Sequence, residues 1–396
     1  MGDRARDPFV DNFDTFVEWK SEADCEAFDG AGATMSQTVQ VARNDIAKSR
    51  IVAHETPLLG EGEVRLRVES FSVTANNVTY ALIGEQFGYW NFFPPQSAED
   101  SGDWGVVPMW GHAVVEASTC PDIAVGERVY GYLPMATHLD VRPGKVSPGT
   151  FTDMAAHRQP MSPIYNQYSR LAADPEHDPA REAERMIFGP LFKTGFLIEA
   201  MMRREGWFGA GTVILTSASS KTALALASVA RDKSPQIARI GLTSPGNIGF
   251  VEGTGLYDRV LAYDAIGDLP QQRSVSVDFA GNAAVLRAIH ETLGENLVYS
   301  CLVGATHVDA RAFGAASLPG PAPILFFAPD HAVATIAELG PRGFGEAVGA
   351  SWKRFVDEVA GSVAVDERHG LEAAAAAFVS TVRGEADPAL GIVIRP

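Results

Sequence analysis

The spacing of apolar residues changes along this chain, and the change predicts two kinds of structure. Over residues 63–158 the segments are short and punctuated by Gly and Pro, and EVRLRVESFSV alternates charged and apolar residues as a half-buried β-strand does. From Thr212 onward, strands alternate with helices, as in TVILTS, KTALALASVARD, ARIGLTS, RVLAYD, SVSVDFAG, NAAVLRAIHETLG, NLVYSCLVG and PILFFAPD. Such alternation predicts a parallel sheet with helices on both faces. The predicted fold class is therefore α/β, with a β-rich part followed by a doubly wound part.

Other patterns complete the chain. PLFKTGFLIEAMMRREG has apolar residues at helical spacing and predicts a helix that ends at Gly206. After about residue 335, SWKRFVDEVAG and GLEAAAAAFVSTVRG are again helical, and LGIVIRP predicts a closing strand. Residues 1–36 are acidic with scattered aromatics and precede a new pattern, so we expect them to form a separate N-terminal extension.

Composition narrows the function classes. A chain of 396 residues is long enough for two domains, and its net charge of −17 argues against nucleic acid and anionic membranes as partners. No apolar run approaches the roughly 18 residues of a membrane span. Cys25, Cys120 and Cys301 lie far apart without zinc-ligand spacing, which is typical of thiols in a reducing compartment. We therefore expect a cytoplasmic protein that acts on small molecules.

The stretch TVILTSASSKTALALASVA has the strand, loop and helix of a dinucleotide-binding turn but lacks its glycines. Ser217, Lys221 and Ala223 stand where glycines are expected. The free N–H groups and the dipole of the helix start still favour an anion there. Side-chain donors for a phosphate surround the same point: the hydroxyl groups of Ser217, Ser219, Ser220 and Thr222 and the ammonium group of Lys221. A plain buried strand and helix joined by a serine-rich turn is the alternative.

The end of the following strand favours NADP(H) over NAD(H). An NAD site usually places Asp or Glu about 20 residues after the glycines, on the ribose hydroxyl groups. Here ARIGLTSPGN places Thr243, Ser244 and Asn247 at that point, with no carboxylate to repel a 2′-phosphate. Tyr263 ends the strand after that, and we expect it over the adenine or against the phosphate.

Taken in order, these segments resemble the medium-chain dehydrogenase/reductase superfamily, in its zinc-free quinone and enoyl reductase branch. More narrowly, the chain resembles bacterial proteins that carry a domain of unknown function. The resemblance covers about residues 37–396. It rests on GEGEVRLRVESFSVTANNVTYALIG, on PMWGHAVVEAS with DIAVGERVYGY, on GTFTDMAAHR, on VILTSASSKTALALA and on the closing GLEAAAAAFVSTVRGEADPALGIVI. Each segment is a loose match, but their order and spacing are specific.

The resemblance implies a GroES-like β-rich catalytic domain over residues 37–185, a Rossmann NADP-binding domain with a doubly wound parallel sheet over 186–335, and a return of residues 336–396 to the first domain. The cofactor would lie in the cleft between the domains. Zinc-dependent members use Cys, His and an acid as ligands, whereas here SVTANN contains no Cys and Ala113 replaces the Glu that follows the His. Because a catalytic zinc site needs three protein ligands, we expect no metal, and we expect His112 to be a core residue bonded to backbone.

Without zinc, a side chain or solvent must protonate the substrate. The resemblance implies a tyrosine soon after the first catalytic-domain strand, and NNVTYALIGEQFGYWNFFP offers Tyr89 as the first choice and Tyr80 as the second. Asn77, with Asn76, is expected to orient the substrate or the nicotinamide ribose. Packing in the cleft wall is the alternative role for both tyrosines. Further cofactor contacts are implied at Lys193 in PLFKTG and at Gly304 and Thr306 in LVGATH.

Aromatic residues crowd the same stretch and its neighbours: Phe87, Tyr89, Trp90, Phe92, Phe93, Trp104 and Trp110. Rings of this kind line apolar ligand sites, and they also build the core of a loop-rich domain. The sequence therefore predicts a zinc-independent, NADPH-dependent oxidoreductase that reduces a carbonyl or an activated C=C bond of an apolar or aromatic molecule. The alternatives are a catalytically silent NADP(H)-binding sensor or partner-binding protein and a lyase or isomerase. A homodimer is left open.

Overall fold

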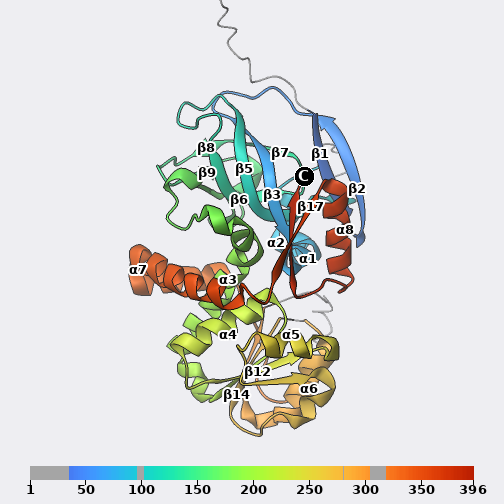
Figure 1. The fold of residues 1–396 in the computed structure, drawn as a ribbon, viewed down its shortest axis with the longest axis vertical. Coiled ribbons are helices and arrows are strands. Elements are labelled where there is room, and N and C mark those ends of the chain that lie inside the picture. The colour runs from blue at the N-terminus through green and yellow to red at the C-terminus, as the bar shows by residue number, and fades with distance from the viewer. Residues whose placement is uncertain (1–34, 96–101, 280, 304–317) are drawn as a thin grey trace, which may run out of the picture.

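The computed structural model describes residues 35–95, 102–279, 281–303 and 318–396. The β-rich part forms two sheets, which occupy the upper half of Figure 1. A small sheet has the order β2-β1-β4, with β1 Met35–Ala42, β2 Asp45–Glu55 and β4 Trp104–Gly105. Val39 and Val41 of β1 are fully buried, and they pack into the core of the neighbouring larger sheet.

The larger sheet combines segments from distant parts of the chain. Its order is β17-β18-β3-β5-β6-β10-β9-β8, and β7 also pairs with β3. The strands are β3 Val64–Val73, β5 Pro108–Ser118, β6 Arg128–Pro134, β7 His138–Val141, β8 Pro143–Gly144, β9 Thr150–Asp153, β10 Gln167–Arg170, β17 Ala364–His369 and β18 Leu390–Arg395. Only β17 and β18 are parallel among these described pairs. The predicted strands at residues 63–73 and 390–396 are confirmed.

The third sheet is parallel throughout its described pairs, as the alternating pattern predicts. Its strands are β11 Thr212–Leu215, β12 Ala238–Thr243, β13 Arg259–Ala262, β14 Ser274–Asp278, β15 Leu297–Leu302 and β16 Ile324–Leu325. Their spatial order is β13-β12-β11-β14-β15-β16. The order along the chain reverses between β11 and β14, which is the arrangement of a doubly wound dinucleotide-binding sheet. The connecting helices are α4 Lys221–Lys233, α5 Ile248–Gly253 and α6 Ala283–Leu293.

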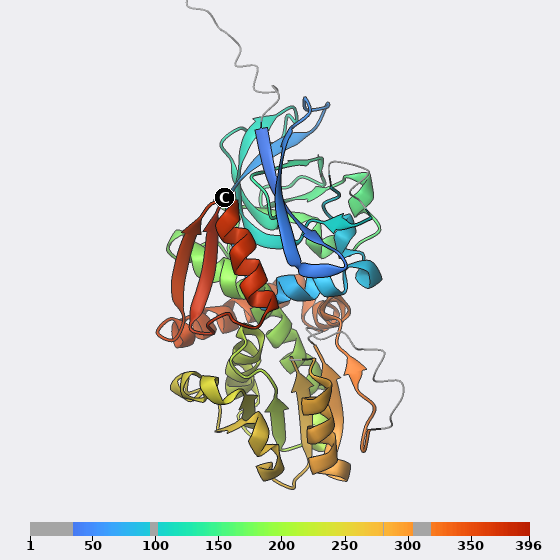
Figure 2. The same cartoon turned by 90° about the vertical axis from the view of Figure 1, so that its right-hand side faces the viewer.

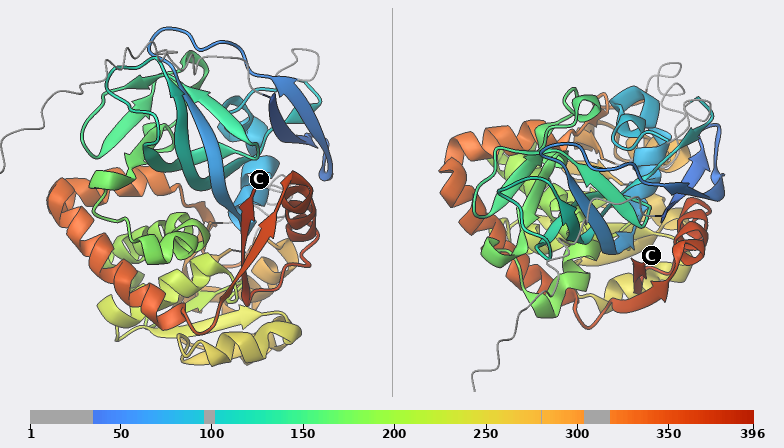
Figure 3. Two further views of the ribbon diagram at one scale, coloured as in Figure 1. Left: turned by 45° about the horizontal axis from the view of Figure 1, so that its top comes forward. Right: turned by 90° about the horizontal axis from the view of Figure 1, so that it is seen from above.

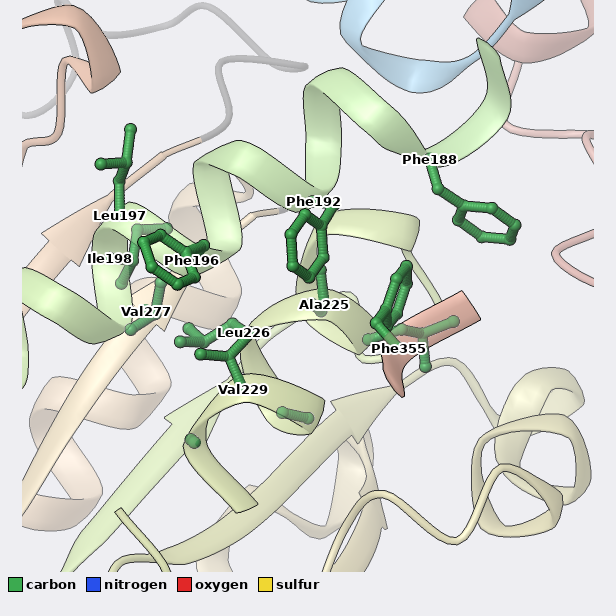
Figure 4. Close-up of a cluster of buried hydrophobic side chains, with 14 of the residues drawn as sticks. Phe188, Phe192, Phe196, Leu197, Ile198, Ala225, Leu226, Val229, Val277 and Phe355 are labelled. Atoms are coloured by element: carbon green, nitrogen blue, oxygen red, sulfur yellow. The ribbon is translucent and has the colours of Figure 1, made fainter. Parts of the chain in front are cut away.

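Two long helices, α3 Glu182–Arg204 and α7 Ala328–Val359, lie between the β-rich part and the parallel sheet (Figures 1 and 2). Helix α3 begins at Glu182, eight residues before Pro190, the first residue of the predicted helix. Met186, Ile187 and Phe188 extend its buried face toward the N-terminus. Its face toward α4 packs very closely, since a Cβ on Gly195 would lie 2.7 Å from the backbone nitrogen of Leu226. Phenylalanines of α3 meet α4 and Phe355 of α7 in this core (Figure 4).

The C-terminal segment returns to the β-rich part, as the views of Figure 3 show. Strand β18 pairs with β3, and α8, Leu371–Val382, packs on the same core through Ala374, Ala377 and Phe378. The small alanine side chains allow this close packing. Strand β17 was not predicted because AVDERH is mostly polar, which suits its place at the edge of the sheet.

Shorter helices complete the described chain. Helices α1 Ala75–Leu82 and α2 Gly84–Phe87 follow β3 directly. The 3₁₀ helices are Tyr89–Asn91, Ala156–Arg158, Pro163–Tyr165, Leu171–Ala173, Pro179–Arg181, Gly206–Gly209, Pro245–Asn247, Tyr263–Asp268 and Gly294–Asn296. Within the described ranges, no helix combines the length and the apolar character that crossing a membrane requires.

Candidate active site

A cleft of about 500 Å³ lies between the parallel sheet and the β-rich part, within the roughly 300–1,000 Å³ that is usual for ligand sites. One wall is the loop from β11 into α4, at the point where the strand order of the parallel sheet reverses. Helices α1 and α2, the start of α7 and residues 384–392 form the others. Ligands of doubly wound sheets bind at this reversal point, so the cleft is the candidate active site.

The loop before α4 has the backbone of an anion-binding turn. Ser217, at the first expected glycine position, has a positive φ of 44°. Ser220 caps the helix, and its hydroxyl oxygen accepts a hydrogen bond from the Ala223 N–H at 3.3 Å. Among the described residues, the backbone N–H groups of Ser219, Lys221 and Thr222 have no acceptor. Unpaired N–H groups at the start of a helix bind anions, and here they lie in the cleft wall.

Lys221 lines the cleft but is held by the C-terminal segment. Its Nζ donates to the backbone oxygens of Pro388 and Leu390, both at 3.0 Å. Burial lowers the pKa of Lys221 to about 8, and the charge of Asp387 opposes this shift. The ammonium group has three N–H donors, so one is left for a ligand. Its contact with a phosphate remains a prediction.

Of the other predicted nucleotide contacts, Asn247 lines the cleft, whereas Thr243, Ser244 and Tyr263 lie beside it. Asn247 lines the cleft with Ser219, and its Nδ2 donates to Ser219 Oγ at 3.3 Å. Thr243 is buried at the end of β12, and Ser244 precedes the turn that carries Asn247. Tyr263 supports the loop from behind, because its hydroxyl oxygen accepts a hydrogen bond from the Ser217 N–H at 2.9 Å.

The remaining predicted contacts lie elsewhere. Lys193 of α3 lines a smaller cavity beside the cleft, and its Nζ is 3.0 Å from Glu176 Oε2. Gly304 and Thr306 fall outside the described residues. These three contacts remain predictions.

Tyr80, on α1, lines both the cleft and the smaller cavity. Its hydroxyl oxygen accepts hydrogen bonds from Asn76 Nδ2 at 3.1 Å and from Trp110 Nε1 at 3.3 Å. Both nitrogens are donors, so neither of these two bonds uses the hydroxyl hydrogen of Tyr80. Burial raises the pKa of Tyr80 well above 10, although the bonds from Trp110 and Asn76 act against it. The group therefore stays protonated at neutral pH.

Tyr89 and Asn77 are engaged differently. The Tyr89 ring packs on Tyr80 with centroids 4.6 Å apart, and its hydroxyl lies 3.1 Å from the hydroxyl of Tyr165. Asn77 is buried, its Nδ2 donates to the Pro108 oxygen at 2.8 Å, and its Oδ1 accepts from the Thr74 N–H at 2.7 Å. The amide of Asn77 thus holds the backbone around α1, whereas Asn76 reaches the cleft and Tyr80.

Sequence reasoning missed other residues that surround Tyr80. Tyr165 lines both cavities, although it begins the polar stretch YNQYSRLAADPEHD, in which the sequence singles out no site residue. Arg185 lines the smaller cavity from the start of α3, ahead of the predicted helix. Trp110 was noted only for its ring, yet its N–H orients Tyr80. The available signal at Tyr165 was two tyrosines, Tyr165 and Tyr168, in a polar stretch, which is too weak to identify a site.

His112 is fully buried in β5, as expected of a core residue, but its predicted bond to backbone is wrong. Neither ring nitrogen has a hydrogen-bond partner in the described part of the chain. The ring instead packs against Tyr130 with centroids 5.0 Å apart. Burial lowers the pKa of His112 to about 3. Across the described residues, no three His, Cys, Asp or Glu side chains gather as metal ligands would.

Comparison with known proteins shows first the fold and then the family. Structures that share the fold include a putative NADPH:quinone reductase (mll3093) from Mesorhizobium loti, at a TM-score of 0.56 and 14% identity over 91% of this chain and 98% of that chain. CurA in complex with NADPH from Vibrio vulnificus matches with a TM-score of 0.52 and 14% identity, over 91% of this chain and 98% of that chain. The yhdH oxidoreductase from Salmonella enterica in complex with NADP matches with a TM-score of 0.50 and 13% identity, over 91% of this chain and 99% of that chain.

These likenesses show the fold of the medium-chain dehydrogenases/reductases, with a GroES-like part and a Rossmann sheet. Residues 71–387 match the family described as "Protein of unknown function (DUF2855)", so the chain belongs to that family. No curated protein matches the sequence.

Proposed function

We propose that this protein is a reductase that uses NADPH to reduce a carbonyl or an activated C=C bond of a small apolar or aromatic molecule, without a metal ion. One observation carries the proposal: the open N–H groups at the start of α4 and the hydroxyl of Tyr80 line one cleft. The first feature suits a nucleotide phosphate and the second suits a proton donor. The shared fold with proteins crystallised with NADPH and NADP supports this reading.

The residues of the α4 loop fit the pyrophosphate of a dinucleotide. The N–H groups of Ser219, Lys221 and Thr222 lie at the start of α4, where the helix dipole also favours negative charge. The hydroxyls of Ser219 and Thr222 lie in the same wall. When bound, NADPH supplies the hydride, and the chain supplies binding, orientation and the proton.

The charges of the cleft favour NADPH over NADH. Of the described residues that line it, Asp387 alone carries a carboxylate, and its charge acts on Lys221. The end of β12 carries Thr243 and Ser244, with Asn247 next in the wall. An acid at this position would bind the ribose hydroxyls of NADH and would repel the 2′-phosphate of NADPH. Hydroxyl and amide groups are compatible with the phosphate.

Tyr80 is the proposed proton donor, ahead of Tyr89. As hydride reaches the substrate, the acceptor oxygen or carbon takes the hydroxyl proton of Tyr80. The phenolate that forms is stabilised by the hydrogen bonds from Asn76 and Trp110, and it regains a proton from solvent. Tyr89 lacks two such donors in the described structure, since its hydroxyl pairs with that of Tyr165.

The donor set supports chemistry without zinc. The family's histidine position is occupied by His112, which is buried in β5 and outside both cavities. Polarising the substrate oxygen therefore falls to Tyr80 and its two partners.

The test is NADPH oxidation by the full-length protein against a panel of enones, quinones and aryl ketones, with NADH and with EDTA as parallel conditions. We expect turnover with NADPH, a lower dissociation constant for NADPH than for NADH, and unchanged rates in EDTA. Tight NADPH binding without turnover of any compound would favour a silent binding protein. Stoichiometric zinc, with activity lost on its removal, would overturn the metal-free assignment.

A further inference from the structure

A second cavity, of about 200 Å³, adjoins the cleft and shares Tyr80 and Tyr165 with it. Rings from the β-rich part and from the long helices α3 and α7 line it, among them Trp110, Tyr130, Phe192 and Trp352. An apolar cavity of roughly 150 Å³ is enough to hold benzene. This cavity therefore has room for one aromatic ring with small substituents, placed directly against the hydroxyl that we assign to proton transfer.

Arg185 gives this aromatic cavity a polar group. Its side chain is only 9% exposed, and one terminal nitrogen, Nη2, lies 2.6 Å from Asp174 Oδ2. The guanidinium also lies over the Tyr130 ring, 4.2 Å from the centroid. The other terminal nitrogen, Nη1, is buried and has no hydrogen-bond partner among the described residues. Because an unpaired buried donor is unfavourable, an acceptor atom on a ligand would complete the site.

The charges at the cavity are already balanced. Arg185 pairs with Asp174, and Lys193 pairs with Glu176 at 3.0 Å. The inner pair is nearly buried, whereas Lys193 and Glu176 are 46% and 38% exposed. A carboxylate on the ligand would bring a further negative charge to cations that already have partners. A neutral oxygen would satisfy Nη1 without disturbing that balance.

We propose that this cavity is the substrate subsite and that it takes an uncharged, single-ring aromatic compound. The reducible bond lies at Tyr80, and an acceptor oxygen on the remote side of the ring binds Nη1 of Arg185. This inference rests on the proposed function, because the reducible bond is placed by the role of Tyr80.

Two glycines of α7 allow the cavity to be blocked with a matched control. Gly349 lines the cavity, and a Cβ added there meets nothing within 4 Å. Gly345, one turn earlier, also has nothing within 4 Å of an added Cβ, but it is exposed and lines neither cavity. Gly349→Leu should therefore fill the cavity, whereas Gly345→Leu makes the same change on the helix surface.

The ligands are three para-substituted benzaldehydes of similar shape: 4-acetyl, 4-isopropyl and 4-carboxy. Binding to the full-length protein is measured by calorimetry with NADP⁺ present and absent, so that affinity is read without turnover. We expect the 4-acetyl compound to bind at least fivefold tighter than the other two. Gly349→Leu should weaken its binding at least tenfold, and Gly345→Leu should leave it unchanged.

Arg185→Lys tests the polar contact, because it keeps the charge opposite Asp174 and removes the planar guanidinium with Nη1. The preference for 4-acetyl over 4-isopropyl should fall to less than twofold, and a thermal melt checks that the variant is folded. Equal binding to both glycine variants, or the tightest binding by the 4-carboxy compound, would overturn the proposal. If Gly349→Leu abolished binding of the benzaldehydes and the protein did not bind NADPH, the cavity would still be a ligand site, but the protein would not be the proposed reductase.

Discussion

Two walls of the cleft differ in how the chain builds them: a polar wall comes from one short stretch of chain, whereas an aromatic wall around Tyr80 is assembled from distant segments. The first is the run from Ser217 to Thr222, and it presents backbone N–H groups at a helix start. The second brings Tyr80, Tyr89 and Tyr165 to the cleft, and their hydroxyl groups bond neighbouring side chains, as Tyr80 does with Trp110 and Tyr89 with Tyr165. The polar wall is thus suited to bind a phosphate through backbone N–H groups, and the aromatic wall is suited to donate a proton from a side chain.

The two walls should therefore respond differently to single substitutions. Removing one hydroxyl from the polar wall leaves its backbone N–H groups in place, so weakening phosphate binding there should require an added negative charge. Removing the Tyr80 hydroxyl from the aromatic wall deletes the atom that we propose as the proton donor.

The largest effect is expected from Tyr80→Phe, which keeps the ring and deletes the hydroxyl. General acid catalysis is worth about 10²–10⁴-fold, so kcat should fall at least about a hundredfold while the dissociation constant of NADPH stays constant. Steady-state kinetics and a fluorescence titration of NADPH measure the two quantities.

Tyr89→Phe is the matched control for Tyr80→Phe, because the two rings pack together and both line the cleft. It should lower kcat less than tenfold. A larger loss from Tyr89→Phe than from Tyr80→Phe would reverse our assignment and restore the order that the family resemblance implies.

The same contrast explains how far the sequence could be read. The polar wall is local, so the strand, the loop and the helix of residues 212–230 could be predicted from apolar spacing and the hydroxyl run. The fold class and the parallel sheet follow from the same alternation. The missing glycine at Ser217 did not prevent the turn, because the serine adopts the positive φ itself.

The aromatic wall could not be predicted in the same way, because its contacts join residues far apart in the chain. Tyr80 accepts a hydrogen bond from Trp110, and Tyr165 reaches the same cavity from a connection that the pattern marked as polar. Composition places rings in this part of the protein but does not say which hydroxyl accepts hydrogen bonds from two nitrogen donors. The burial of His112 could be predicted, but its unpaired nitrogens could not.

The next effect concerns the polar wall. Thr222 stands in the first turn of α4 with an open N–H group, so Thr222→Glu places a negative charge against the bound phosphate. The dissociation constant of NADPH should rise about thirtyfold, or ~2 kcal/mol, as expected for like charges a few Å apart near a protein surface.

The stability of the same variant should change in the opposite direction. An acid in the first turn of a helix is favourable by about 0.3–1 kcal/mol, so the melting temperature of the free protein should hold or rise. Thr222→Gln is the control without charge and should bind NADPH within about threefold of wild type. If Thr222→Glu lowered both the melting temperature and the affinity for NADPH, the substitution would have damaged α4, and a phosphate beside Thr222 would not be supported.

His112 gives a pH effect that belongs to neither wall. Its folded pKa of about 3 lies below the unfolded value of 6.5, because burial disfavours the charged ring. The unfolded chain therefore binds the proton first, and the free energy of unfolding falls as pH drops from 6.5 toward 3, by up to about 1.4 kcal/mol per pH unit.

His112→Leu should remove this contribution, since the ring has no hydrogen bond to lose in the described structure. Urea unfolding of both proteins at pH 7, 6 and 5 measures the difference. The free energy of unfolding of the variant should rise relative to that of wild type at each lower pH. If the two free energies changed with pH in parallel, His112 would not be a buried neutral histidine.

The smallest effect is expected at the turn itself. Ser217 has φ of 44°, a region that is unfavourable for a side chain by about 1–2 kcal/mol and open to glycine. Ser217→Gly also loses a weak contact of Oγ with the Tyr263 hydroxyl, 3.4 Å away, and adds freedom to the unfolded chain. The net gain in the free energy of unfolding should be about 0.5 kcal/mol, and NADPH should bind as before. Ser219→Gly, at a position without positive φ, should instead lower stability. If Ser217→Gly weakened NADPH tenfold, the serine hydroxyl would be a ligand contact, and the loop would bind by side chains as the opposite wall does.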